Sequence, residues 1–127
     1  MAEFDTLLAR ARSVLNPQQL SDDAQCGTVS AALETAQGDV FVGICIDMRC
    51  SLGFCAERAA AATMLTQGQN VIVRMVAVSH RGPILAPCGA CREFISQLSP
   101  LNLNAEVLVN ETDVARLGDL MPYRWPD

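Results

Sequence analysis

Two short cysteine motifs constrain the fold of this chain more than any other feature: "FCAER" at residues 54–58 and "PCGACR" at residues 87–92. Each stands where a helix is expected to begin, because an alanine-rich run ending at Gly68 follows the first and apolar residues at helical spacing follow the second. Free N–H groups and the helix dipole favour thiolate over thiol at such positions. A fold that brings the two helix starts together gathers three cysteines and a glutamate in a small volume.

The CxxC pair Cys88 and Cys91 has three interpretations when taken alone: half of a metal site, a redox pair, or core cysteines. Cys55 and Glu57 upstream favour the metal site, because three thiolates suit tetrahedral zinc and leave a fourth position open, as in a catalytic zinc site. His80, the single histidine, would instead close a structural site of three cysteines and one histidine. That structural site and a thiol redox protein remain as alternatives.

Composition excludes several classes of function. At 127 residues the chain is expected to form one domain, residues 1–127. Its formal net charge of −5, from nine basic and fourteen acidic side chains, argues against nucleic-acid polymers and anionic membranes as partners. Residues 1–15 contain charges and no continuous apolar run, and no later run reaches the roughly 18 residues of a membrane span. We therefore expect a cytoplasmic protein whose cysteines are free thiols, catalytic groups or metal ligands.

Apolar periodicity and turn residues predict a mixed α/β fold. The expected elements are a helix at 3–15, hairpin strands at about 26–35 and 40–47, a helix from 55 that stops at 68, a strand at 70–79, a helix from 88 to about 99 and a strand at 105–110. The tail, 114–127, is expected to hold one helical turn and an ordered extended segment. An antiparallel hairpin followed by strands with helical crossovers predicts a mixed sheet with helices on both faces, a three-layer α/β/α arrangement.

The motif "CAE" followed by "PCGACR" resembles the signature of the zinc-dependent cytidine deaminase superfamily. Its all-cysteine form, "CAER", is similar to the small tetrameric cytidine deaminases and to blasticidin S deaminase. The predicted element order matches that fold over nearly the whole chain. The resemblance therefore implies a cytidine deaminase-like fold, one Zn²⁺ per chain, a nucleoside substrate and a homotetramer.

The resemblance also assigns chemistry to the two motifs. It implies that Cys55, Cys88 and Cys91 bind the zinc, and that Glu57 carries protons without being a ligand. The implied reaction replaces the C4 amino group of a cytosine ring by hydrolysis, so that the uracil form and ammonia are produced. Cytidine or deoxycytidine is the default substrate. A non-catalytic, deaminase-like zinc protein is the alternative from another class.

Two neighbours of Glu57 are further candidates. Arg58 matches the family arginine that donates hydrogen bonds to the thiolates, although a solvated helix arginine is the simpler interpretation. The backbone of Ala56 corresponds to the position that hydrogen-bonds the pyrimidine ring, where a small residue lets the base approach. Alanine is also simply a good helix former.

The second strand departs from the family pattern. Nucleoside deaminases of this type carry Asn-x-Glu there to hold the ribose hydroxyls, whereas this strand ends with Cys45 and Asp47. A thiol is a poor replacement for an amide, but Asp47 can still accept a hydrogen bond from a hydroxyl. Both residues are candidate substrate contacts, and a modified nucleoside such as blasticidin S becomes the alternative substrate.

The C-terminal tail offers two aromatic candidates. The segment before the first strand lacks the aromatic usual in the family, and blasticidin S deaminase also ends shortly after a Tyr-x-Trp pair like Tyr123 and Trp125. These side chains are expected to stack on or rim the substrate, in this subunit or a neighbouring one; alternatively they pack the tail onto the body or an interface. Cys26, Cys45 and Cys50 are interpreted as structural or substrate-side thiols.

Overall fold

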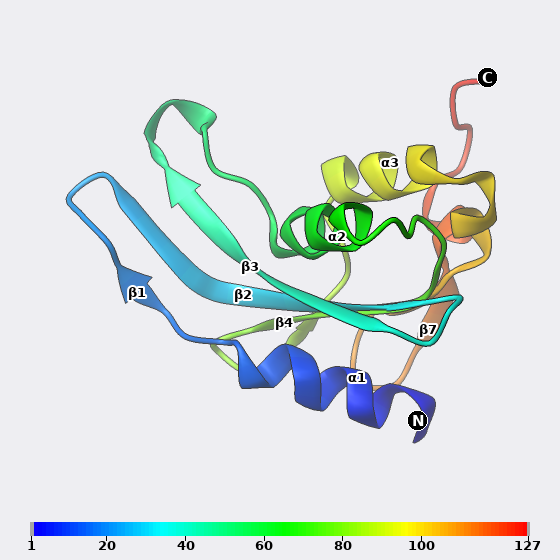
Figure 1. Ribbon diagram of the computed structural model, residues 1–127, viewed down its shortest axis with the longest axis horizontal. Helices are drawn as coiled ribbons and strands as arrows, with labels where there is room; N and C mark the ends of the chain where they lie inside the picture. Colours follow the sequence, from blue (N-terminus) through cyan, green and yellow to red (C-terminus); the bar gives the residue numbers. More distant parts are fainter. Residues whose placement is uncertain (1, 127) are drawn as a thin grey trace.

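A long antiparallel hairpin organises the sheet in this computed structural model, which describes residues 2–126 (Figure 1). It consists of β2 (Ala24–Thr35) and β3 (Val40–Met48), joined by a turn in which Gly38 has a φ of 88° that suits glycine. β2 also pairs antiparallel with β4 (Ile72–Ser79) and so lies between β3 and β4. The hairpin predicted from the sequence is confirmed.

Shorter strands complete a mixed sheet: β1 (Gln18–Gln19), β5 (Ile84–Leu85), β6 (Glu106–Leu108) and β7 (Val114–Arg116). β6 pairs parallel with β4 and antiparallel with β7. β1 pairs antiparallel with β2, and β5 pairs antiparallel with β4. The strand expected at 105–110 is shorter than predicted. It ends early because the Asn110 Oδ1 accepts the N–H groups of Thr112 and Asp113 and turns the chain towards β7.

Helices cover both faces of the sheet, so the predicted α/β/α layers are confirmed. α1 (Ala2–Ser13) lies on one face, and α2 (Ala56–Thr66) and α3 (Gly89–Leu98) lie on the other (Figure 1). Successive residues of a strand point to opposite faces. Leu33 and Met75 accordingly pack on the side of α2 and α3, while their neighbours Ala32 and Val76 pack on the side of α1.

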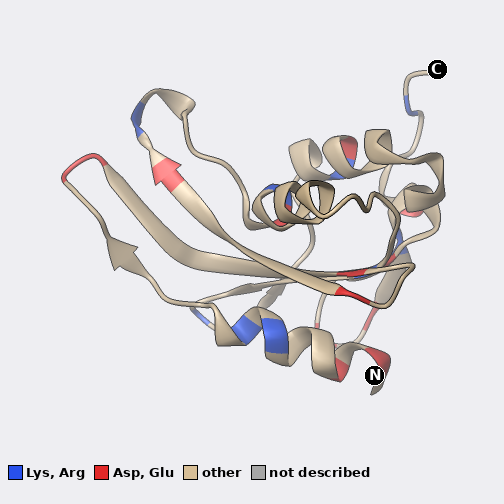
Figure 2. Ribbon diagram, viewed as in Figure 1, with Lys and Arg blue, Asp and Glu red and all other residues tan. Residues whose placement is uncertain are grey.

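The ends of α1 suit its dipole. Its first turn is acidic and its last turn basic, and the two charge types lie at opposite ends of the helix in Figure 2. Its buried stripe consists of Phe4, Leu7 and Ala11. Among the described residues, no helix combines the length and apolar character needed to cross a bilayer.

The short elements were not predicted. β1 and β5 span two residues each, which is too few to give a periodic pattern. The helical turn expected in the tail is a 3₁₀ turn, η3 (Leu117–Leu120), and the strand β7 precedes it. These additions extend the edges of the sheet and leave the predicted centre unchanged.

A close contact between β3 and α2 positions the start of α2. Gly43 on β3 faces the first turns of α2, and a Cβ built on Gly43 would lie 2.7 Å from the Ala56 carbonyl oxygen and would also overlap the Ala60 nitrogen. A side chain at this point would separate the strand from the helix. The absence of one lets the residues around Ala56 approach the sheet.

Replacing Gly43 by alanine is therefore expected to lower the free energy of unfolding by about 1–3 kcal/mol, the usual cost of overpacking. Equilibrium unfolding in urea measures the change. Gly89→Ala is the matched control, because a Cβ there meets no atom within 4 Å, and its effect should stay within about 1 kcal/mol. Equal stability of Gly43→Ala and the unsubstituted chain would contradict the close contact.

Candidate active site

The N-terminal ends of α2 and α3 bring three cysteines together. Cys55 and Cys88 are the N-cap residues of α2 and α3, both with extended backbone, and neither side chain caps its own helix. Cys91 lies within the first turn of α3 and is buried. The Cys88 Sγ is 3.5 Å from the Cys55 Sγ and 3.4 Å from the Cys91 Sγ, and all three sulfur atoms lie within 4.8 Å of one another. The predicted gathering of these thiols is confirmed.

The geometry of the cluster fits one tetrahedral metal ion. Zinc–sulfur bonds of about 2.3 Å give ligand sulfurs about 3.8 Å apart in a tetrahedron, close to the separations of 3.4 and 3.5 Å between neighbouring thiols. Within residues 2–126 the cluster has three such ligands and no fourth. His80 is elsewhere, with its Nδ1 3.1 Å from the Thr28 carbonyl oxygen. The cluster can therefore hold a metal with one coordination position open.

Neighbouring groups shift the pKa values of the thiols and of Arg58 in different directions. The Arg58 guanidinium donates to the Cys55 Sγ at 3.7 Å, and this contact raises the pKa of Arg58. Burial and the nearby Glu57 raise the pKa of Cys91. Burial acts in the same sense on Cys88, but hydrogen bonds from Cys91 and other neighbours outweigh it and lower the pKa of Cys88. A metal that binds the three thiols must displace their protons.

Glu57 lies beside the cluster in the first turn of α2. Only 4% of its surface is exposed, which is unusual for a carboxylate. Burial raises its pKa, while a backbone hydrogen bond and the charge of Arg58 act in the opposite sense. A carboxyl group with a raised pKa holds a proton more readily than an exposed one, which suits a group that accepts and returns protons.

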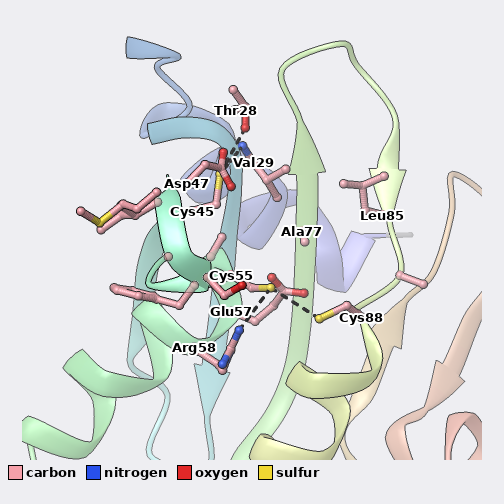
Figure 3. A pocket seen from close by; sticks show the side chains of 17 residues that line it. Thr28, Val29, Cys45, Asp47, Cys55, Glu57, Arg58, Ala77, Leu85 and Cys88 are labelled. Carbon is pink, nitrogen blue, oxygen red and sulfur yellow. Dashed lines mark hydrogen bonds between the residues drawn. The ribbon is translucent and has the colours of Figure 1, made fainter. Parts of the chain in front are cut away.

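A pocket of about 580 Å³ opens from the cluster towards the end of β3. Figure 3 shows Cys55, Glu57 and Cys88 at one end and Thr28, Cys45 and Asp47 at the other. The predicted residues that line it are Cys45, Asp47, Cys55, Ala56, Glu57, Arg58 and Cys88. The residues of the two cysteine motifs therefore line the same pocket as Cys45 and Asp47, the two residues of β3 that depart from the family pattern.

The tail residues lie outside this pocket. Tyr123 is fully exposed and Trp125 almost so, and both line shallow depressions against α3. The Arg124 guanidinium donates to the Ser96 Oγ at 3.3 Å and holds the tail there. Within one chain the two aromatics do not reach the candidate site, and contact with the substrate of a neighbouring subunit stays a prediction.

Several residues that line the pocket were not predicted from the sequence, among them Phe54 and Thr28. Phe54 lines the pocket and is 40% exposed, held by a two-way backbone hydrogen-bonded bridge to Ile46. Phe54 directly precedes Cys55 in the sequence, and this position was a signal for an aromatic wall of the pocket. Thr28 gave no such signal, since it reaches the pocket through an irregularity of β2.

The chain was compared with protein-family models, curated proteins and solved structures, and no protein-family model matches it. A cytidine deaminase from Halalkalibacterium halodurans is 35% identical over 98 residues, which cover 74% of each protein. A blasticidin-S deaminase from Bacillus cereus is 31% identical over 81 residues, 57% of this chain and 58% of that protein. The crystal structure of cytidine deaminase from Mycobacterium tuberculosis superposes with a TM-score of 0.81 at 24% identity, covering 98% of both chains.

A three-layer α/β fold with three thiols and a buried glutamate at two adjacent helix starts has the features that the sequence resemblance implied for a deaminase. The relatives in sequence and the similar solved structures are cytidine deaminases as well. The chain belongs to the cytidine deaminase family. The superfamily and the fold predicted from the sequence are confirmed.

We expect the purified protein to carry one metal ion per chain and Cys91→Ala to lose it, because only two thiols would remain. Elemental analysis after dialysis measures the metal. Cys50→Ala is the control, since Cys50 is exposed and outside the cluster, and it should retain the metal. A metal-free dithiol that is reversibly oxidised would contradict the site and support the redox alternative.

Proposed function

We propose that this protein hydrolyses the C4 amino group of the cytosine ring of a small nucleoside and releases ammonia. One observation carries the proposal: in a chain of the cytidine deaminase family, the buried Glu57 lines the same pocket as Cys55 and Cys88. Cytidine or deoxycytidine is the default substrate. The free thiols of the chain support a reducing compartment, and we propose the cytoplasm.

We propose Zn²⁺ as the metal, held by Cys55, Cys88 and Cys91. The all-sulfur donor set supports this choice, because soft thiolate ligands favour zinc over magnesium, calcium or manganese. When bound, zinc lowers the pKa of water and makes it a nucleophile at neutral pH. Two helix N-termini and the Arg58 guanidinium offset part of the negative charge of three thiolates.

Glu57 moves the protons of the proposed reaction. Its carboxylate takes a proton from the attacking water and delivers it to N3 of the pyrimidine. The water oxygen bonds to C4, and Glu57 then takes the second proton from that oxygen and gives it to the amino group, so that the bond from C4 to nitrogen breaks and ammonia leaves. Burial keeps this carboxyl group away from bulk water.

Small and apolar residues around Glu57 suit a planar base. Ala56 and Ala77 leave space in the pocket, and Phe54 and Leu85 add apolar surface. The first backbone N–H groups of α2, which begins at Ala56, lack partners within the helix, and we propose that the Ala56 backbone hydrogen-bonds the ring. These features support recognition of the cytosine base near the thiol cluster.

Glu57→Gln is expected to retain the metal and the fold while turnover falls by about 10²–10⁴-fold, because the amide keeps the shape but cannot carry the proton. Ammonia release and metal content are measured on the same preparation. Undiminished turnover in this variant would rule out the proposed role of Glu57. An inactive wild-type chain with a full metal site would instead favour a non-catalytic zinc protein.

Blasticidin S is the second candidate substrate. The similarity to a blasticidin-S deaminase and the presence of Cys45 and Asp47 at the far end of the pocket support it. Ammonia release from cytidine, deoxycytidine, cytosine and blasticidin S distinguishes the candidates. We expect cytosine to be the poorest of the four, because it cannot occupy the end of the pocket near Asp47.

We also propose a homotetramer with active sites near subunit contacts. The exposed apolar side chains Met48 and Phe54 line the pocket, Leu52 is exposed in the segment between them, and Tyr123 and Trp125 are exposed in the tail. Burial of these side chains against neighbouring subunits would remove apolar surface from water. Sedimentation should give a tetramer, and a fully active monomer would refute this proposal.

A further inference from the structure

An irregularity of β2 shapes the end of the pocket away from the cysteine cluster. The pairing of β2 with β3 shifts register between Cys26 and Ser30, and Gly27 within this bulge has a φ of 80°. A bulge beside an active site re-aims the side chains that follow it. Here Thr28 and Val29 line the pocket.

Two neighbours hold the bulge in place. The Thr28 carbonyl oxygen accepts a hydrogen bond from the backbone N–H of His80 at 2.8 Å, and it lies 3.1 Å from the Nδ1 of the His80 ring. The Val29 N–H donates to the Cys45 Sγ at 3.3 Å, and Cys45 is only 7% exposed. The sulfur is therefore occupied inside the protein, although Cys45 lines the pocket.

The Thr28 hydroxyl retains hydrogen-bonding capacity. Its Oγ1 lies 3.2 Å from the Cys45 Sγ, and either atom can be the donor. A hydroxyl has one donor and two acceptor positions. If the thiol donates, Thr28 keeps one acceptor position, and if Thr28 donates, it keeps two. In both cases at least one acceptor position is free for a ligand.

Acceptors dominate this end of the pocket. Asp47 lines it with a carboxylate, and a second depression beyond it, which Asp47 also lines, includes Asp22 and Asp23. Figure 2 shows this acidic character at the far end of the hairpin, where Arg49 pairs with Asp23 at 2.6 Å. A ligand group at this end must therefore donate hydrogen bonds, as a sugar hydroxyl does.

We propose that Thr28 is a specificity-determining residue that accepts a hydrogen bond from one hydroxyl of the nucleoside sugar, and that Cys45 positions it. Figure 3 supports the placement, because Thr28 and Cys45 lie at the opposite end of the pocket from Glu57 and Cys88. This inference rests on the proposed function, since the base is taken to lie at the cysteine cluster. Cys45 acts through Thr28 and does not itself contact the sugar.

A cycle of protein and substrate changes tests the contact. The rate constant kcat/KM is measured for cytidine and its 2′-, 3′- and 5′-deoxy analogues with the wild type, Thr28→Val and Thr28→Ser. A net hydrogen bond is worth about 1 kcal/mol, so Thr28→Val should lower kcat/KM for cytidine about 5-fold. For one of the deoxy analogues, Thr28→Val and the wild type should have the same kcat/KM, because that analogue lacks the hydroxyl that Thr28 contacts. Thr28→Ser should behave as the wild type.

Control variants separate contact from structure. Thr63→Val, the same change at an exposed position of α2 outside the pocket, should leave all four values unchanged. Cys45→Ala removes the acceptor of the Val29 N–H and should weaken the coupling between Thr28 and the hydroxyl, whereas Cys45→Ser should preserve it. Metal content and urea unfolding are measured for every variant.

The outcomes are distinguishable. Equal losses for all four substrates in Thr28→Val, or no loss for any, would overturn the role of Thr28 and leave the proposed function intact. Full coupling in Cys45→Ala would overturn the positioning role of Cys45. A wild type that deaminates none of the four nucleosides would overturn the default substrate together with this inference.

Discussion

The pairing of β2 with both β3 and β4 is the constraint on which the site depends. α2 follows β3 and α3 follows β4 and β5, and both helices cover the same face of the sheet. Their first turns therefore meet, and the thiols at these turns gather at 3.4 and 3.5 Å. Gly43 contributes by letting α2 approach β3 more closely than any side chain would allow.

The adjacent first turns of α2 and α3 also determine which charges lie near the three thiols. Three thiolates at one point would repel one another, and the unsatisfied N–H groups of two helices, together with Arg58, would reduce that cost. Glu57 is buried in the same first turn, where its pKa is raised. One arrangement of backbone thus brings together the three thiols and the buried carboxyl group.

The two ends of the pocket differ in how far the sequence predicted them. Cys55, Glu57 and Cys88 were predicted because short motifs at helix starts carry chemistry that few other patterns explain. Thr28 was not, since a register shift in β2 has no period that a sequence reveals. Tyr123 and Trp125 were expected near the substrate, but their tail lies against α3, outside the pocket of its own chain.

The sequence by itself determined the order of the central strands and helices and the groups available for chemistry, because periodicity and the positions of motifs are local properties of the chain. Its two cysteine motifs also carried the resemblance to the deaminase family. Only the tertiary structure decided that the Cys45 sulfur is occupied by Val29 and Thr28, that Phe54 borders the pocket and that His80 lies against the bulge of β2, outside the thiol cluster. These outcomes depend on strand register and on contacts between segments far apart in the sequence, which no local pattern encodes.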